Sequence, residues 1–241
     1  MSYLNEFLFG IYPYLALAVF FAGSLLRFDR DQYTWKSDSS QLLRAGQLRW
    51  GSNLFHGGIL FLFFGHVFGQ LTPHWLYEPF ISASQKQFVA IVAGGLAGAI
   101  CFVGLTLLLH RRIFDPRIRL TSHRTDIAIL VILWVQLVIG LVTLPYSWGH
   151  REEATTMIVL ANYLQGIATF RPDTSLLVGI EWHFLAHMLL GMTIFLLFPF
   201  SRLVHVWSGF ASVAYLFRPY QVVRSRRLNL PAGHNTPPVR N

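Results

Sequence analysis

The stretch "SNLFHGGILFLFFGHVFGQL", residues 52–71, decides how the rest of the chain is interpreted. It contains no Lys, Arg, Asp or Glu, and it is long enough for a helix to cross about 30 Å of hydrocarbon. Two histidines, His56 and His66, nevertheless lie inside it. Polar side chains at membrane depth are costly and tend to serve a function. The stretch therefore predicts a membrane-spanning helix that carries two functional imidazoles.

The composition of the whole chain supports a membrane protein. Of its 241 residues, 54% are hydrophobic and only 12% are charged, about half the charged share of a typical soluble domain. Such spans must be helical, because lipid offers the backbone no hydrogen-bond partner. The fold class is therefore all-α, an integral membrane bundle of five transmembrane helices. These are expected at roughly 7–26, 53–72, 88–109, 127–146 and 182–201. The first lacks a basic start and a small-residue cleavage site, so it is not interpreted as a removable signal peptide.

The distribution of charge predicts the orientation of the bundle. Three segments, 27–50, 111–125 and the tail from 202 onward, hold sixteen of the nineteen basic residues. With five spans, these segments face the same compartment, and basic residues are retained in the cytoplasm. The N-terminus is then outside and the C-terminus is cytoplasmic. The basic charge is accounted for in this way, without nucleic acid as a partner.

Two domains are expected. Residues 1–205 form the five-helix transmembrane domain, and residues 206–241 form a basic cytoplasmic tail with a disordered end. The aromatic and basic part of the tail is either a membrane-surface anchor or a docking surface for a cytoplasmic partner. In the outer loop, residues 154–170 predict a helix that lies on the membrane surface.

Histidines on two of the spans suggest a cofactor. His56 and His66 lie on the second span, while His183, His187 and His205 lie on or beside the fifth. Because these spans are antiparallel, His56 pairs with His205 near the inner face, and His66 pairs with His187 near the outer face. Facing imidazoles above and below a flat macrocycle form the bis-histidine site of a b-type haem, and helix bundles commonly build cofactor sites from facing side chains. With one cysteine and no C-x-x-C-H motif, such haems would not be attached covalently.

The spacing of the histidines fits two haems only in part. His187 and His205 are separated by five full turns, a rise of about 27 Å, whereas His56 and His66 are separated by about 15 Å. Tilted helices, or a kink at Pro199, would be needed to absorb the difference. His183 shares a face with His187 and competes with it, but choosing His183 would worsen the mismatch.

Other residues have both a functional and a structural interpretation. Small residues beside the histidines would let a porphyrin approach the backbone, although helix packing explains them as well; they are Gly57, Gly58, Gly65, Gly69 and Gly191. Arg27, Arg112 and Arg202 are candidate partners for haem propionates, or simply flanking residues that reach the interface. Lys86 is an outer cation that would bind a propionate or a quinone oxygen, or anchor its helix.

The chain resembles the membrane (gamma) subunit of respiratory nitrate reductase, a dihaem cytochrome b. The resemblance covers about residues 3–227. It rests on "FGIYPYLALAVF" (9–20), "QYTWKSDSSQ" (32–41), "SNLFHGGIL" (52–60), "GHVFGQLTPHW" (65–75), "RRIFDPRIRLTS" (111–122) and "LLGMTIFLLFPFSRLVHVWS" (189–208).

The resemblance implies residue roles that agree with the pairing above. His56 and His205 would be axial iron ligands of an inner haem b, and His66 and His187 of an outer one. Lys86 and Gly65 would line a quinol site beside the outer haem.

The resemblance also implies a function. Ubiquinol or menaquinol would be oxidised at the outer side of the bacterial inner (cell) membrane, with its protons released outside. Electrons would pass through the outer and then the inner haem to an iron–sulfur (beta) subunit, and on to a molybdenum (alpha) subunit that reduces nitrate. Both partner subunits would lie on the cytoplasmic face. The associated processes are anaerobic respiration and nitrate assimilation.

Three alternatives remain open. A dihaem cytochrome b of a sulfite- or heterodisulfide-type reductase complex would use the same histidines, and the longer motifs favour nitrate. A membrane transporter with a histidine proton relay would need acids beside the histidines, but Asp126 and Glu181 lie at span ends. A purely structural anchor leaves four aligned histidines unexplained.

Overall fold

The computed structural model describes residues 3–30 and 43–207, and this part of the chain is helical without strands. Five helices are long and apolar enough to cross a membrane, and they confirm the predicted number. Each extends beyond the predicted apolar stretch at one end or both, except for the fifth. The five spans are Tyr3–Arg30, Ala45–Leu71, Ala83–Phe114, Arg124–Gly149 and Trp182–Phe200. The predicted roles of the tail lie outside the described residues.

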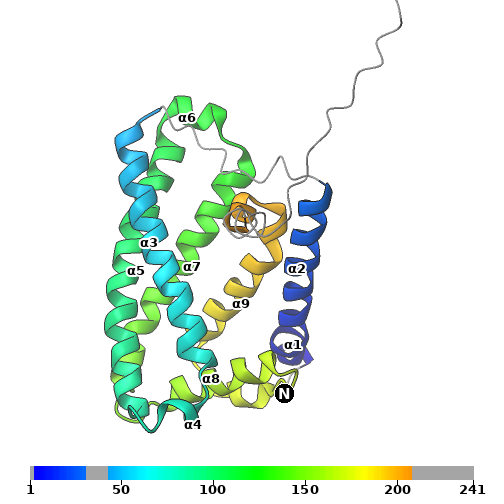
Figure 1. Ribbon diagram of the computed structural model, residues 1–241, viewed down its shortest axis with the longest axis vertical. Helices are drawn as coiled ribbons and strands as arrows, with labels where there is room; N and C mark the ends of the chain where they lie inside the picture. Colours follow the sequence, from blue (N-terminus) through cyan, green and yellow to red (C-terminus); the bar gives the residue numbers. More distant parts are fainter. Residues whose placement is uncertain (1–2, 31–42, 208–241) are drawn as a thin grey trace, which may run out of the picture. The chain divides into compact units, whose positions relative to one another are not determined.

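Figure 1 shows the order of the individual elements along the described parts of the chain. The first span comprises α1 (Tyr3–Glu6), a π-helical turn (Phe7–Ile11) and α2 (Tyr12–Arg30). The middle of the chain forms α3 (Ala45–Leu71), α4 (His74–Tyr77), α5 (Ala83–Phe114), α6 (Pro116–Thr121) and α7 (Arg124–Gly149). The last part forms α8 (Thr155–Ala168), a 3-10 turn (Thr174–Leu177), α9 (Trp182–Leu197) and two further 3-10 turns (Phe198–Phe200 and Arg202–Val204). Backbone contacts divide the chain into two units, Met1–His205 and Val206–Asn241.

Within the first unit, the long helices pack in the order α3, α5, α7, α9, α2. The tightest contact joins α3 to α5 across three glycines. A Cβ atom on Gly104 would lie 2.3 Å from the backbone nitrogen of Phe55, and one on Gly58 would lie 2.6 Å from Cβ of Cys101. Gly51 lies against Leu108 and Gly104 in the same seam. The two backbones therefore approach as closely as small residues permit.

The fifth span, Trp182–Phe200, agrees with the predicted stretch, but its last residues are not α-helical. Helix α9 stops at Leu197, and the chain continues through a 3-10 turn that contains Pro199 to an extended residue, Ser201. Proline has no N–H with which to continue the ladder, so this break has a local cause. The guanidinium of Arg27 donates to the carbonyl oxygens of Pro199 at 2.7 Å and Ser201 at 2.9 Å. The break lies at Pro199, where the spacing of the histidines predicts a kink, and His187 and His205 do not lie on one continuous α-helix.

A second packed region lies at one end of the bundle, where α8 crosses the ends of the long helices (Figure 1). Its buried side chains come from the π-helical turn, α8 and the following 3-10 turn; they are Phe9, Leu160, Tyr163, Ile167 and Leu177. The hydroxyl of Tyr163 donates to the carbonyl of Phe9 at 2.6 Å. The helix predicted at 154–170 is confirmed as α8.

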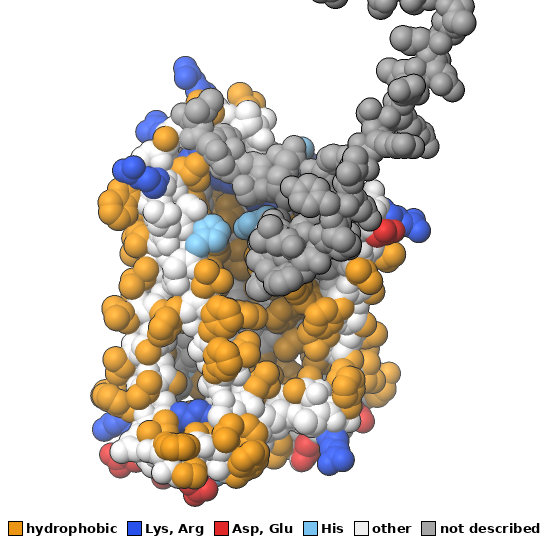
Figure 2. Space-filling model, viewed as in Figure 1, with side chains coloured by type: hydrophobic (Ala, Val, Ile, Leu, Met, Phe, Trp, Pro, Cys, Tyr) orange, Lys and Arg blue, Asp and Glu red, His pale blue; other side chains and the backbone are white. Residues whose placement is uncertain are grey.

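The outer surface of the helices is apolar along most of its length. In Figure 2, hydrophobic side chains cover the middle of the visible face, while charged side chains gather toward its two ends. Large side chains such as Phe61, Phe68 and Leu96 are more than half exposed. A soluble protein rarely exposes so much contiguous apolar surface. The arrangement is that of a multi-pass membrane protein.

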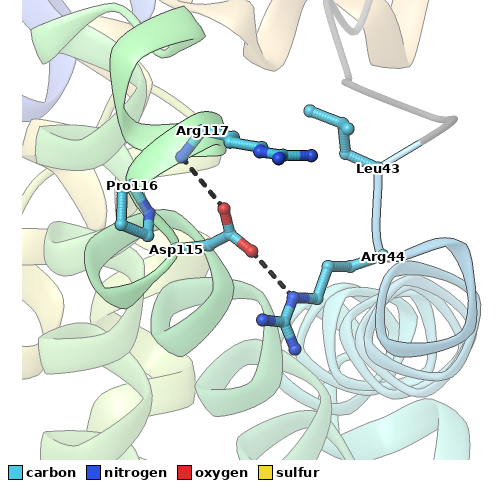
Figure 3. A pocket seen from close by; sticks show the side chains of 5 residues that line it. All are labelled: Leu43, Arg44, Asp115, Pro116 and Arg117. Atoms are coloured by element: carbon cyan, nitrogen blue, oxygen red, sulfur yellow. Dashed lines mark hydrogen bonds and ion pairs between the residues drawn. The ribbon is translucent and has the colours of Figure 1, made fainter.

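An ion pair joins the start of α3 to the junction of α5 and α6. Asp115 caps α6 by accepting hydrogen bonds from the backbone of Arg117 and Ile118, and it accepts one from Nε of Arg44 at 2.8 Å. Figure 3 shows its carboxylate between the backbone nitrogen of Arg117 and the guanidinium of Arg44. These residues line a cavity of about 390 Å³ together with Leu43 and Pro116. Burial raises the pKa of Asp115, but the bonds to Arg44 and to the α6 backbone outweigh it, and the net pKa is lowered.

Candidate functional site

Four histidines form two facing pairs between α3 and the α9 region. The ring centroids of His56 and His205 are 6.1 Å apart, and those of His66 and His187 are also 6.1 Å apart. The planes of the rings are inclined by 76° in the first pair and by 37° in the second. The structure thus brings together the same pairs that the antiparallel spans predict.

The Nδ1 atom of every one of these four rings lies against a backbone carbonyl. In His56 and His66 the acceptor is the carbonyl one helical turn earlier, at 2.7 Å in both cases. The acceptor for His205 is the carbonyl of Arg202 at 2.6 Å, and that for His187 is the carbonyl of Gln136 at 3.2 Å. A carbonyl only accepts, so each Nδ1 carries the proton and each Nε2 carries the lone pair. Metal-ligating histidines are commonly oriented in this way.

The spacing of each pair fits one metal ion between two imidazoles. With a metal–nitrogen bond of about 2.0 Å and a ring radius of about 1.1 Å, two rings on opposite sides of one ion would have centroids about 6.2 Å apart. The observed 6.1 Å agrees with this value for both pairs. Burial lowers the pKa of His205, and nearby His56 and Arg202 lower it further, against its bond to the carbonyl of Arg202. A neutral imidazole is the form that binds metal.

The face of α3 that carries the histidines has open space beside it. His56 and His66 are exposed, and only 6% of the apolar window of α3 is buried within the chain. A Cβ atom on Gly57, Gly65 or Gly69 would meet nothing within 4 Å. A flat group therefore has room to approach this backbone. Gly58 differs, because it packs against Cys101 of α5 and belongs to the helix seam.

Two residues of α7, Gly140 and Gln136, contact His187, and neither is among the predicted site residues. A Cβ atom on Gly140 would lie 2.7 Å from Cε1 of the His187 ring. The Gln136 amide donates from Nε2 to the carbonyl of His187 at 3.0 Å. Gly191, predicted to lie beside a cofactor, instead leaves space for that amide at 3.3 Å. A glycine and a glutamine in an apolar helix carry no sequence signal that distinguishes these roles from packing.

The predicted quinol-site residues lie at the end of the bundle where α3 ends and α5 begins. Gly65 precedes His66 in the last turns of α3, and Lys86 lies in the first turn of α5. The ammonium of Lys86 lies 3.7 Å from the centroid of the Tyr77 ring on α4, a cation–π contact. Burial and the charge of Glu78 raise the pKa of Tyr77.

Two of the three arginines predicted to hold propionates, Arg112 and Arg202, share one carboxylate, whereas Arg27 donates to the carbonyls of Pro199 and Ser201. Arg112 and Asp126 are both buried and form an ion pair at 3.1 Å, and Arg202 lies 3.7 Å from the same Asp126 oxygen. Arg112 also donates to the hydroxyl of Ser122. Asp126 therefore draws both guanidinium groups to the end of the bundle near the His56–His205 pair. Their predicted contact with propionates stays a prediction.

His183 does not join either pair. Its side chain is 1% exposed, and its ring lies against Tyr146 at a centroid distance of 4.0 Å and against Phe184 at 4.6 Å. Its Nε2 atom is buried without a hydrogen-bond partner among the described residues. The structure thus separates the two histidines that compete in the sequence.

These observations define a class: a multi-pass helical membrane protein with two facing histidine pairs between the second and fifth spans. The chain belongs to the nitrate reductase gamma subunit family, which matches residues 5–226. As a member of this family it is a membrane subunit of a respiratory nitrate reductase, an oxidoreductase complex.

Three relatives illustrate the similarity. The respiratory nitrate reductase 1 gamma chain of Escherichia coli (strain K12) is 49% identical over 227 residues, which are 94% of this chain and 100% of the relative. The respiratory nitrate reductase 2 gamma chain of the same organism is 50% identical, with the same coverage. The nitrate reductase gamma chain of Bacillus subtilis (strain 168) is 38% identical over 92% of this chain and 99% of its own length.

Proposed function

We propose that the chain is the quinol-oxidising dihaem cytochrome b subunit of its nitrate reductase complex. The observation that carries the proposal is the pair of matched histidine sites, each with centroids 6.1 Å apart and Nδ1 atoms held by backbone carbonyls. His56 and His205 would hold one haem b, and His66 and His187 the other. When bound, the haems would supply one-electron transfer between the two ends of the bundle.

The helices would hold and tune these groups without covalent attachment. Backbone carbonyls keep each imidazole in the tautomer that presents Nε2, and this bond raises the basicity of the ligand. The glycines of α3 leave space for a flat ring, and the apolar surroundings of the membrane spans would keep water away from it. Burial and ligand identity are the levers by which a protein sets a haem potential.

Lys86 and Gly65 would bind the quinol beside the His66–His187 pair. A lysine ammonium donates hydrogen bonds, so it would hold a quinol oxygen and favour negative charge on it as a proton leaves. Tyr77 fixes the ammonium through its ring face. Gly65 would let the quinol ring approach the α3 backbone, where a Cβ atom meets no neighbour.

The charge distribution supports an orientation for this process. The segments rich in arginine would face the cytoplasm, so the Lys86 end would face outward and quinol protons would be released outside. The membrane would be the bacterial inner membrane. An iron–sulfur subunit and a molybdenum subunit would bind on the cytoplasmic face and take up the electrons. Inward electron flow would then conserve about 2.3 kcal/mol per charge per 100 mV.

A reduced-minus-oxidised spectrum of the complex purified from membranes tests the proposal. Two b-type haems per gamma chain, both reduced by a quinol analogue and reoxidised by nitrate, are the expected result. A colourless gamma chain, or haems that quinol does not reduce, would refute it.

A further inference from the structure

Gln136 is a polar residue in the middle of the apolar helix α7, and its contacts converge on His187. Its backbone carbonyl accepts from Nδ1 of the histidine ring at 3.2 Å. Its side-chain Nε2 donates to the backbone carbonyl of His187 at 3.0 Å. The same Nε2 lies 3.4 Å from Nε2 of the ring, longer than an ordinary N–H hydrogen bond.

Packing alone does not explain an amide at this position. The Oε1 atom of Gln136 is buried with no hydrogen-bond partner among the described residues. A buried acceptor without a partner is unfavourable, and an apolar side chain of similar length would avoid it. Gly191 on α9 leaves space for the amide, since a Cβ atom there would lie 3.3 Å from Nε2. Helix α7 thus supplies the amide and α9 supplies both the carbonyl that accepts from it and the space that it occupies.

We propose that Gln136 is the positioning residue of His187: its backbone carbonyl holds Nδ1 of the ring and its amide holds the backbone of His187 against α7, so that together they fix the orientation of this imidazole and thereby the redox properties of the haem that the His66–His187 pair would hold. The inference rests on the proposed function. Its physical basis is that hydrogen bonds to a ligating histidine set ring orientation and ligand strength.

The other pair has a corresponding side chain, which provides an internal comparison. Oγ of Ser52 lies 3.1 Å from Nδ1 of His56, next to the carbonyl bond of the same residue at 2.7 Å. Each pair therefore has one ligand with an adjacent polar side chain. Variants of Ser52 and Gln136 should act on different haems.

The test compares three variants of the whole complex by redox titration and low-spin EPR. Gln136→Met keeps the length of the side chain but removes its donor. Gln165→Met is the matched control, because Gln165 makes the same kind of bond between helices, to the carbonyls of Gln70 at 2.9 Å and Thr72 at 3.4 Å. Ser52→Ala is the reciprocal variant. A His66→Ala complex identifies which signals belong to the His66–His187 haem.

In Gln136→Met, the midpoint potential and EPR g values of the His66–His187 haem should shift, while the other haem keeps both. Selective loss of that haem would also support the proposal. Ser52→Ala should shift only the other haem, and Gln165→Met neither. Unchanged signals in Gln136→Met, or equal shifts of both haems, would overturn the inference. A wild-type complex without two haems would instead refute the proposed function, before any variant is compared.

Discussion

The rings of His56 and His205 face each other at 6.1 Å because the α-helix that carries His187 ends at Leu197, and two 3-10 turns joined by the extended Ser201 lead on to His205. A continuous helix would separate these two histidines by about 27 Å, against about 15 Å for His56 and His66 on α3. The break after Leu197 takes the chain off the axis of α9 and removes this mismatch. Arg27 holds the break through the carbonyls of Pro199 and Ser201.

Loss of one histidine ligand should remove the haem of its own pair and leave the haem of the other pair bound. His66→Ala or His187→Ala should remove the haem at that pair and abolish quinol oxidation, while the complex still assembles and the other haem remains. Haem content per complex and the reduced-minus-oxidised spectrum check this. If either variant kept both haems, the pairing would be wrong.

Lys86→Ala should weaken the binding of a quinone analogue and leave two haems in place. A hydrogen bond from a charged group contributes about 1.5–3 kcal/mol, so Kd should rise about tenfold or more. Titration with the quinone analogue, followed by fluorescence or calorimetry, measures this Kd. Tyr77→Phe, which keeps the ring under the ammonium, is the control with near-normal binding. If Lys86→Ala bound the quinone analogue as tightly as the wild type, the lysine would serve only to anchor its helix.

Gly104→Ala should force α3 and α5 apart, because the added Cβ would lie 2.3 Å from the nitrogen of Phe55. Overpacking of this kind costs about 1–3 kcal/mol. Thermal unfolding in detergent should show a lower midpoint and earlier haem loss. Gly46→Ala on α3 has no neighbour within 4 Å of its Cβ, so it should be neutral or slightly stabilising. Equal unfolding midpoints for Gly104→Ala and Gly46→Ala would contradict the close contact between α3 and α5 at Gly104.

Gly23→Ala should disturb the break after α9. Its Cβ would lie 2.8 Å from Cγ of Pro199, and a proline ring has little freedom to move away. The haem of the His56–His205 pair should be lost more readily on heating than the haem of the other pair. Separate spectra of the two haems during thermal denaturation measure this, and equal loss of both would contradict it.

The bond between Asp115 and Arg44 should make stability depend on pH. The pKa of Asp115 is lowered in the folded chain, so its contribution is present above the unfolded pKa and is lost as pH falls through the folded value. Asp115→Ala should lower the unfolding temperature at neutral pH, with a smaller effect in acid. Asp115→Asn should lower the unfolding temperature less than Asp115→Ala does, because asparagine also caps helices. A pH-independent effect would exclude the charge as its cause.

Much of this structure follows from the length and order of the apolar stretches and from the positions of the histidines in them. Five spans and the pairing of His56 with His205 and His66 with His187 could be predicted, because span length and alternating direction fix which ends of two helices meet. The roles of Gly140 and Gln136 could not, because they depend on the rotation of α7 about its axis. Gly58 shows the same limit: a glycine that faces Cys101 and one that faces open space look alike in sequence.

Hydropathy predicts the extent of the fifth span but not where α9 ends within it. Apolar residues continue through Phe198 and Phe200, so hydropathy extends the span, whereas the backbone responds to Pro199 and to the carbonyl bonds of Arg27. The sequence shows Pro199, but it does not show that Arg27, far away in the chain, donates hydrogen bonds to the carbonyls on either side of the break.

His56 and His66 lie on a single uninterrupted helix that is clamped by glycines to its neighbour. The regular, hydrogen-bonded backbone of α3, and not the looser fit of side chains, therefore sets the interval between the two sites. Their partners, His187 and His205, come from α9 and the turns that follow it, where the backbone changes direction. If the two sites exchange electrons, selection on the distance between them would act on α3, whereas changes in the α9 segment could adjust each site separately.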